Sequence, residues 1–122
     1  MYSNLKGKKI LIFGNSGFVG SWLSVALHHF KSKVLGVSLK MNNKNYLSNT
    51  KEFYKNIKTL NCDINNLSKI SKKIQKFSPE IVVHLASQPI VNEGYKDPLK
   101  TFNINLFGTI KIFELVKRIK SI

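Results

Sequence analysis

Gly14-Asn15-Ser16-Gly17-Phe18-Val19-Gly20 follows the apolar run Ile10-Leu11-Ile12-Phe13, and this stretch decides the fold. An apolar strand, a glycine-rich turn and the start of a helix form the unit with which α/β proteins hold the pyrophosphate of a dinucleotide. Glycines are required because the backbone approaches the phosphates more closely than a Cβ allows. Amides at the start of the helix donate to the same phosphates. The stretch therefore predicts a dinucleotide-binding site.

The rest of the chain alternates predicted strands and helices. Strands are predicted at residues 9–13, 33–38, 57–61 and 80–85, and helices at 17–31, 67–77 and 98–120. Such alternation implies a parallel sheet with right-handed crossovers, and a glycine turn after the first strand implies the strand order 3-2-1-4. We therefore expect an α/β fold, a partial doubly wound (Rossmann) parallel sheet of about four strands with flanking helices. The polar segment 41–54 is expected to be a loop or a short irregular helix.

Both long helices carry apolar residues at helical spacing. In the first helix we expect Trp22 and Phe30 to pack in the core. Asp97-Pro98 supplies a cap and a first-turn proline for the last helix. Apolar side chains recur along that helix at Leu99, Phe102, Leu106, Ile110, Phe113 and Val116.

The sequence stops after a predicted helix, where a doubly wound fold continues with a fifth strand. We therefore expect residues 1–122 to be one domain that is truncated before strand five. The fourth strand would then present an unpaired edge, and the last helix would expose part of its face at Phe102, Leu106 and Phe113. An isolated chain of this kind is expected to be oligomeric or poorly soluble.

Composition limits the class of protein. Of the 122 residues, 43% are hydrophobic, which suits one globular domain, and no apolar run has the roughly 18 residues of a membrane span. The start of the chain lacks the apolar core of a signal peptide. Cys62 is the only cysteine, so no internal disulfide forms and a cytoplasmic location is expected. We expect Cys62 to be a small buried residue near a strand end.

The formal net charge of +14 raises the question of nucleic-acid binding. Arg118 is the only arginine, however, whereas proteins recognise phosphates and bases largely through arginine guanidinium groups. The lysines are also scattered along the chain. The cluster of Lys69, Lys72, Lys73 and Lys76 is expected to be the solvated face of a short helix. No specific nucleic-acid partner is therefore predicted.

Several stretches together resemble CDP-glucose 4,6-dehydratases, a group of extended short-chain dehydrogenases/reductases. The resemblance begins in Gly14-Asn15-Ser16-Gly17-Phe18-Val19-Gly20-Ser21-Trp22-Leu23 and continues in Pro79-Glu80-Ile81-Val82-Val83-His84-Leu85-Ala86-Ser87-Gln88-Pro89-Ile90-Val91. Residues 95–102 and 105–109 resemble the next helix of these enzymes. Many nucleotide-sugar epimerases and dehydratases share each motif, but the combination of the first two is distinctive. The resemblance covers about residues 8–118 and implies NAD as the cofactor.

The resemblance assigns roles to the residues that match it. Gly14, Ser16, Gly17, Phe18, Val19 and Gly20 would hold the NAD pyrophosphate, Asp63 and Ile64 would meet the adenine, Leu85, Ala86 and Ser87 would line the nicotinamide-side ribose, and Gln88 would face the sugar. Asn105 would brace the loop after the fourth strand. A purely structural role as a cap remains open for Asp63, as does a purely structural hydrogen bond for Asn105. His84 is expected to be a packed or hydrogen-bonded core histidine, and no metal site is predicted.

Three positions depart from the family pattern. Val19 stands where members usually carry a lysine, and Asn92-Glu93-Gly94 stands where they carry an arginine. At the end of the second strand, Ser38-Leu39-Lys40 replaces the carboxylate that many NAD-binding folds direct to the ribose hydroxyls. Lys40 would tolerate a 2′-phosphate, so NADP remains an alternative to NAD.

The family also uses a catalytic Ser or Thr and a Tyr-x-x-x-Lys pair beyond the matched region. Tyr2 with Lys6 and Tyr54 with Lys58 show that spacing by coincidence, and no catalytic residue is assigned. The resemblance implies the amino-terminal NAD-binding portion of an enzyme that eliminates water from CDP-glucose to give CDP-4-keto-6-deoxyglucose in polysaccharide synthesis. Alone it would be inactive, and the complete enzyme is expected to be a homo-oligomer. The alternatives are another nucleotide-sugar epimerase or dehydratase, or a stand-alone non-catalytic dinucleotide-binding module.

Overall fold

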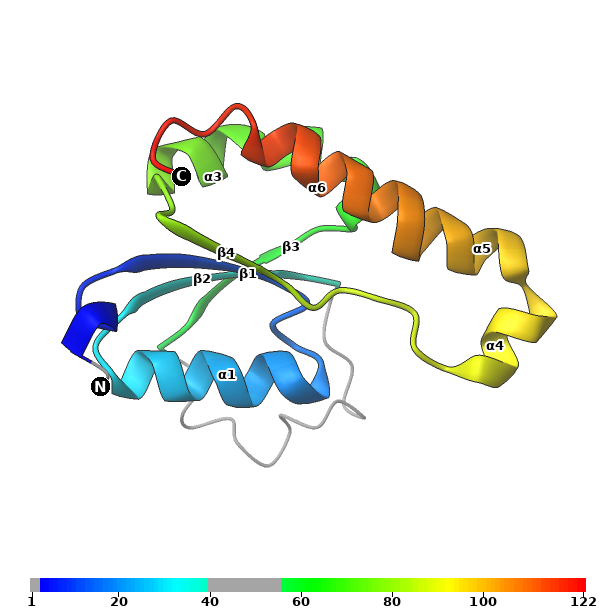
Figure 1. The fold of residues 1–122 in the computed structure, drawn as a ribbon, viewed down its shortest axis with the longest axis horizontal. Coiled ribbons are helices and arrows are strands. Elements are labelled where there is room, and N and C mark those ends of the chain that lie inside the picture. The colour runs from blue at the N-terminus through cyan, green and yellow to red at the C-terminus, as the bar shows by residue number, and fades with distance from the viewer. Residues whose placement is uncertain (1–2, 40–55) are drawn as a thin grey trace.

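The computed structural model describes residues 3–39 and 56–122, and within them four strands form one parallel sheet (Figure 1). The strands are β1 (Lys9–Phe13), β2 (Lys33–Ser38), β3 (Lys58–Asn61) and β4 (Ile81–His84), in the order β3-β2-β1-β4. Leu11 in β1 lies opposite Leu35 in β2 and Val82 in β4. The predicted parallel sheet and strand order are confirmed. Lys40 and the predicted loop at 41–54 lie outside the described residues.

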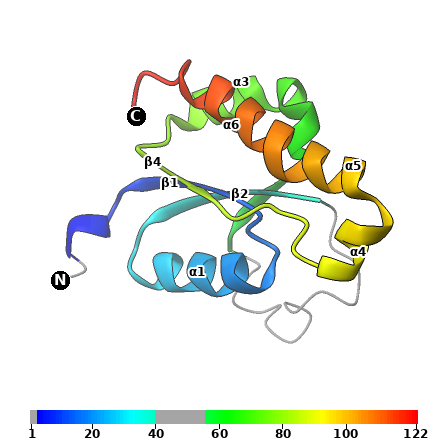
Figure 2. The ribbon, with the colours of Figure 1, turned by 45° about the vertical axis from the view of Figure 1, so that its right-hand side comes forward.

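Helices cover both faces of the sheet. α1 (Phe18–His29) lies on one face, and α3 (Ser71–Phe77) and α6 (Gly108–Val116) lie on the other (Figures 1 and 2). Alternate residues of each strand therefore enter different cores. The α3–α6 side holds the larger cluster, which includes Leu11, Phe13, Leu35, Val37, Ile74, Ile112 and Leu115. The α1 side holds Ile10, Ile12 and Leu27.

α1 packs on the sheet through small residues, and the prediction for Trp22 was wrong. The buried residues of this helix are Gly20, Ser21, Ser24 and Leu27. Trp22 is 60% exposed because it lies two residues from Gly20, which places it on the opposite side of a helix with 3.6 residues per turn. Phe30, just after the helix, is half-buried. The apolar residues of α1 thus do not form one buried face.

Two helical segments differ from the expected boundaries. A 3₁₀ segment, η3 (Ile64–Lys69), precedes α3, so the predicted helix at 67–77 is interrupted at Ile70. Ile70 and Ile74 are buried while the lysine cluster is exposed, as expected. A short helix, α4 (Val91–Lys96), forms where no helix was predicted. The structure also has a short 3₁₀ segment, η1 (Ser3–Leu5), before β1.

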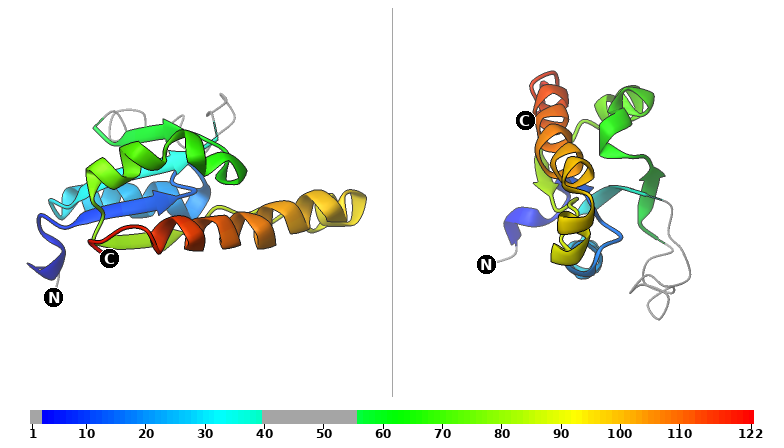
Figure 3. Two further views of the ribbon diagram at one scale, coloured as in Figure 1. Left: turned by 90° about the horizontal axis from the view of Figure 1, so that it is seen from above. Right: turned by 90° about the vertical axis from the view of Figure 1, so that its right-hand side faces the viewer.

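The last predicted helix is continuous in direction but changes its hydrogen-bond pattern. It consists of α5 (Pro98–Phe102), the π-helical turn η4 (Asn103–Phe107) and α6. The Asp97 side chain accepts from the Lys100 amide, which confirms the predicted cap. Figure 3 shows this rod running along the β4 side of the sheet and projecting beyond the strands.

The expected exposed surfaces are present. Within residues 3–39 and 56–122, β4 pairs only with β1, so β4 is an edge of the sheet. Phe102 and Phe113 are 61% and 62% exposed, and Leu106 is 49% exposed. The core-facing side of this rod is made instead by Gly108, Ile112 and Leu115.

Candidate dinucleotide site

The turn after β1 is held by close contacts of its own backbone. Gly14 has φ +83°, a left-handed conformation that favours glycine, and a Cβ there would lie 2.6 Å from the Ala86 backbone nitrogen. The Gly14 amide donates to the Val37 carbonyl (2.8 Å), and the Gly17 amide donates to the Gly14 carbonyl (3.1 Å). A Cβ on Gly20 would overlap the Gly14 carbonyl. The glycines therefore let β1, the start of α1 and the end of β4 meet.

Asn15 ties the same turn to the next two strands. Its side chain is fully buried, and Nδ2 donates to Thr59 Oγ1 in β3 (2.9 Å). The amide group lies directly over Gly36 in β2, where a Cβ would overlap it. The turn is thus anchored to β2, β3 and β4 by contacts within the protein.

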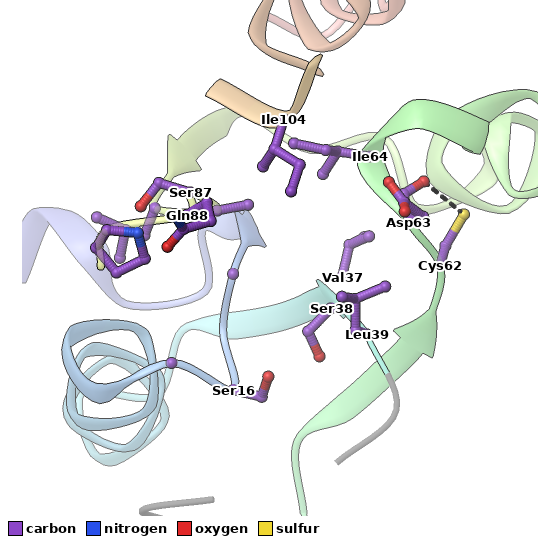
Figure 4. A pocket seen from close by; sticks show the side chains of 15 residues that line it. Ser16, Val37, Ser38, Leu39, Cys62, Asp63, Ile64, Ser87, Gln88 and Ile104 are labelled. Atoms are coloured by element: carbon purple, nitrogen blue, oxygen red, sulfur yellow. Dashed lines mark hydrogen bonds between the residues drawn. The ribbon is translucent and has the colours of Figure 1, made fainter. Parts of the chain in front are cut away.

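A hollow of about 350 Å³ opens beside this turn at the carboxyl ends of the strands (Figure 4). Its lining comes from the glycine turn, the end of β2, the segment after β3, the loop after β4 and the η4 turn. The lining residues are Gly14, Ser16, Gly17, Val37, Ser38, Leu39, Cys62, Asp63, Ile64, Leu85, Ala86, Ser87, Gln88, Pro89 and Ile104. In open α/β sheets this edge is where ligands bind.

A second hollow, of about 730 Å³, is lined in part by the same glycine turn and the same loop after β4. It shares Gly14, Gly17, Leu85, Ala86, Ser87 and Pro89 with the first hollow and adds Phe18, Val19, Gly20, His84, Ile90, Asn105 and Thr109. The two hollows therefore adjoin along the glycine turn and the residues after β4.

The structure brings together all the residues that the sequence analysis assigned to cofactor and substrate. Each of them lines at least one of the two hollows. Sequence reasoning did not assign Val37, Ile104 or Thr109 to the site. Thr109 follows Asn105 by one helical turn, and this spacing is the signal that could have identified it.

Asp63 has a structural role at the wall of the first hollow. Its carboxylate caps η3 by accepting from the Asn65 amide (2.8 Å), as the structural alternative for this residue required. The neighbouring Cys62 is buried, and its single thiol proton is shared between the carbonyl oxygens of Asp63 (Sγ to O 3.3 Å) and Asn66 (3.4 Å). Burial raises the pKa of the Cys62 thiol, and the Asp63 carboxylate adds to the effect. Cys62 is therefore a packed thiol, as predicted.

The loop after β4 is braced by Asn105. Asn105 Oδ1 accepts from the Gln88 amide (2.8 Å), and its Nδ2 donates to the Gln88 carbonyl (3.1 Å). The Gln88 side chain in turn accepts from the Ile90 amide (2.7 Å) and donates to the Ile90 carbonyl (3.1 Å). These paired bonds fix the loop after β4, whose residues line both hollows.

The end of β2 presents a hydroxyl in place of a carboxylate. Ser38 is only 6% exposed, and its Oγ has no hydrogen-bond partner among the described residues. Ser38 lines the first hollow, and Figure 4 shows its hydroxyl directed toward the side on which Ser16 lies. A neutral hydroxyl at this position does not repel a phosphate as a carboxylate would.

Among the described residues, no three His, Cys, Asp or Glu side chains are grouped so that they could hold a metal ion. No helix in residues 3–39 and 56–122 combines the length and apolarity that crossing a membrane requires.

Residues 11–122 match the protein family described as GDP-mannose 4,6 dehydratase. The chain is also similar to CDP-glucose 4,6-dehydratase of Salmonella typhimurium, with 33% identity over 117 residues, covering 96% of this chain and 33% of the relative. This chain thus spans about a third of that relative's length.

Solved structures show the same fold. The epimerase Mth375 of Methanothermobacter thermautotrophicus superposes with a TM-score of 0.84 at 27% identity, over 98% of this chain and 34% of that one. UDP-glucose-4-epimerase of Stenotrophomonas maltophila, solved with bound NAD and formylated UDP-arabinopyranose, superposes with a TM-score of 0.79 at 23% identity, over 90% and 33%. With its family match over nearly the whole chain, this protein belongs to the GDP-mannose 4,6 dehydratase family of nucleotide-sugar enzymes.

Proposed function

We propose that this chain is the amino-terminal, NAD-binding part of a sugar-nucleotide 4,6-dehydratase that acts on CDP-glucose. The observation that carries the proposal is the pair of adjoining hollows around the glycine turn. The turn has no room for side chains at Gly14 and Gly20, while Gly17 faces both hollows. CDP-glucose is proposed because the CDP-glucose 4,6-dehydratase relative shares 33% identity over almost the whole chain.

The residues present fit NAD. The pyrophosphate would lie against the backbone at Gly17 and the start of α1, where no described side chain caps the helix. The adenosine half would occupy the apolar first hollow near Ile64, with Ser38 at the ribose. The nicotinamide half would lie in the second hollow beside Leu85 and Ala86. When bound, NAD accepts and returns a hydride.

The role of this chain in that reaction is to bind and orient the cofactor. In the complete enzyme, which we propose to be a cytoplasmic homo-oligomer, Gln88 would face the sugar. The Gln88 side chain is held by Ile90, so its position is set before substrate arrives. Residues beyond this chain would supply proton transfer, and we expect no turnover by these residues alone.

Calorimetry of the purified chain with NAD tests the cofactor assignment. Gly17→Val should abolish binding, because its side chain would occupy the space that the pyrophosphate needs beside the backbone. The chain should stay folded, because Gly17 has φ −72° and a Cβ there meets only the Gly14 carbonyl, at 3.3 Å. Gly94→Val is the control, since Gly94 lies in α4 outside both hollows and its Cβ would come no closer than 3.7 Å to Thr101. NAD binding that survives in the folded Gly17 variant would disprove the site.

The choice between NAD and NADP is tested at Ser38. Ser38→Asp places a carboxylate where it can accept from the ribose hydroxyls and repel a 2′-phosphate. The ratio of NAD to NADP affinity should rise at least about tenfold in this variant. An unchanged ratio would show that the adenosine ribose does not lie at the end of β2.

A further inference from the structure

Asn105, which bonds to the Gln88 backbone, is itself connected to β4 by a series of hydrogen bonds that runs through the π-helical turn. His84 Nε2 lies 2.9 Å from Thr109 Oγ1, and Thr109 Oγ1 donates to the Asn105 carbonyl at 2.7 Å. The Asn105 side chain then bonds to the backbone of Gln88 at both its donor and its acceptor. One path of contacts thus joins the end of β4 to the loop that lines both hollows.

The single hydroxyl proton of Thr109 fixes the direction of each of these hydrogen bonds. The Thr109 hydroxyl has one proton, and it is used on the Asn105 carbonyl. His84 Nε2 must therefore donate to Thr109 Oγ1, so the neutral imidazole carries its proton on Nε2. Nδ1 of His84 is buried and has no partner in the described part of the chain, so a second ring proton would have no acceptor there. Burial lowers the pKa of His84, in agreement with the neutral ring.

The ring and the turn are both restrained in other ways. Phe13 is fully buried and meets the His84 ring edge-to-face, with centroids 6.4 Å apart and planes at 87°. In the η4 turn the Gly108 amide donates to the Asn103 carbonyl, five residues back. The turn therefore rotates Asn105 relative to a regular α-helix, and single π turns of this kind occur often at functional sites.

We propose that His84 and Thr109 are positioning residues of the cofactor site. Their hydrogen bond holds the η4 turn so that Asn105 pairs with the Gln88 backbone. The loop after β4, which we call the loop wall, is therefore ordered before NAD binds. The inference rests on the proposed function for its ligand, but the wall itself can be tested without a ligand. Asn105 and Thr109 line the second hollow and not the first, so the effect on binding should be larger for the nicotinamide half than for the adenosine half.

Hydrogen exchange of the unliganded chain provides the first test. Thr109→Val keeps the shape of the side chain but removes the hydroxyl, whereas Thr109→Ser keeps the hydroxyl. Relative to the Leu11 amide in β1, protection of the Gln88 amide should fall about fivefold or more in Thr109→Val and stay near wild type in Thr109→Ser. Equal loss at Leu11 and Gln88 in Thr109→Val, or no loss at Gln88, would overturn the proposal.

Affinity provides the second test, and it separates this proposal from the proposed function. NAD binding should weaken about fivefold in Thr109→Val and recover in Thr109→Ser, while ADP binding should weaken clearly less in Thr109→Val. A wild-type chain that binds no NAD would contradict the proposed function, and the exchange data would still decide the positioning role. Equal loss of NAD and ADP affinity would overturn the positioning role.

Nitrogen chemical shifts of the His84 ring in the unmodified chain test the same geometry without a variant. The expected result is a neutral ring with its proton on Nε2. A proton on Nδ1 would contradict the chain of hydrogen bonds, even if Thr109→Val failed to fold.

Discussion

The turn after β1 and the loop after β4 form facing parts of one site, yet they are held in different ways. Backbone packing holds the turn, because Gly14 fits against Ala86 only without a side chain. Paired side-chain hydrogen bonds hold the loop, from Asn105 to Gln88 across seventeen residues. We therefore expect a substitution in the packed turn to cost much of the unfolding free energy. A substitution that removes the exposed hydrogen bonds of the loop should cost only a small part of it.

The largest effect is expected at Gly14. Gly14→Ala combines a left-handed backbone with a Cβ 2.6 Å from the Ala86 nitrogen, so unfolding free energy should fall by about 3 kcal/mol or more. Gly7→Ala is the matched control, since Gly7 has φ +79° but a Cβ there meets no atom of the described residues within 4 Å. It should cost only about 1 kcal/mol. Urea denaturation compares the two, and equal losses would mean that contact with β4 does not constrain the turn.

A smaller but still large effect is expected where the turn meets β2. Gly36→Ala would push its Cβ into the buried Asn15 amide and should cost about 1–3 kcal/mol. Asn15→Ala makes room for that Cβ, so Gly36→Ala should cost clearly less in the Asn15→Ala background. A double-mutant cycle measures this coupling, and strictly additive losses would show that the two residues do not share the space.

The loop wall should respond more weakly. Asn105→Ala removes two exposed hydrogen bonds to Gln88, so the unfolding free energy should fall by only about 1 kcal/mol. Asn103→Ala is the control, because Asn103 is exposed in the same turn and no hydrogen bond of its side chain is found in the described residues. The same urea titration decides the ranking: a loss at Asn105 as large as that at Gly14 would remove the distinction between the two walls.

The same distinction explains what could be predicted from the sequence. The glycine turn and the parallel strands follow from local sequence patterns. In the structure, β1 and β2 begin and end within a residue of the predicted positions. The prediction for Trp22 was wrong because α1 packs on the sheet through the small residues Gly20 and Ser24. The side of α1 that is buried is therefore decided by the size of its side chains rather than by their hydropathy. The π turn and the bond from His84 to Thr109 depend on the register between β4 and the last helix. The spacing of apolar residues within one element does not predict that register.

The smallest effect is expected at the opposite end of β1 and β4, far from both walls. There the Glu80 carboxylate accepts from Lys8 Nζ (2.6 Å) and from the Lys9 amide (3.0 Å), and the hydrogen bond from Lys8 lowers the pKa of Glu80 below its ordinary value of 4.5, with a further contribution from Lys9. Because the folded pKa is the lower one, the stabilisation is complete above the ordinary value and is lost as the pH falls through the folded value. Glu80→Gln should therefore lower stability slightly at neutral pH and flatten the loss on acidification by the same small amount, since the pair is exposed to solvent. Urea titrations from neutral to acidic pH test this, with Lys8→Gln as the partner variant that removes the same ion pair. If the Glu80→Gln and wild-type curves ran parallel at every pH, this end of the two strands would be held by the β1–β4 ladder alone.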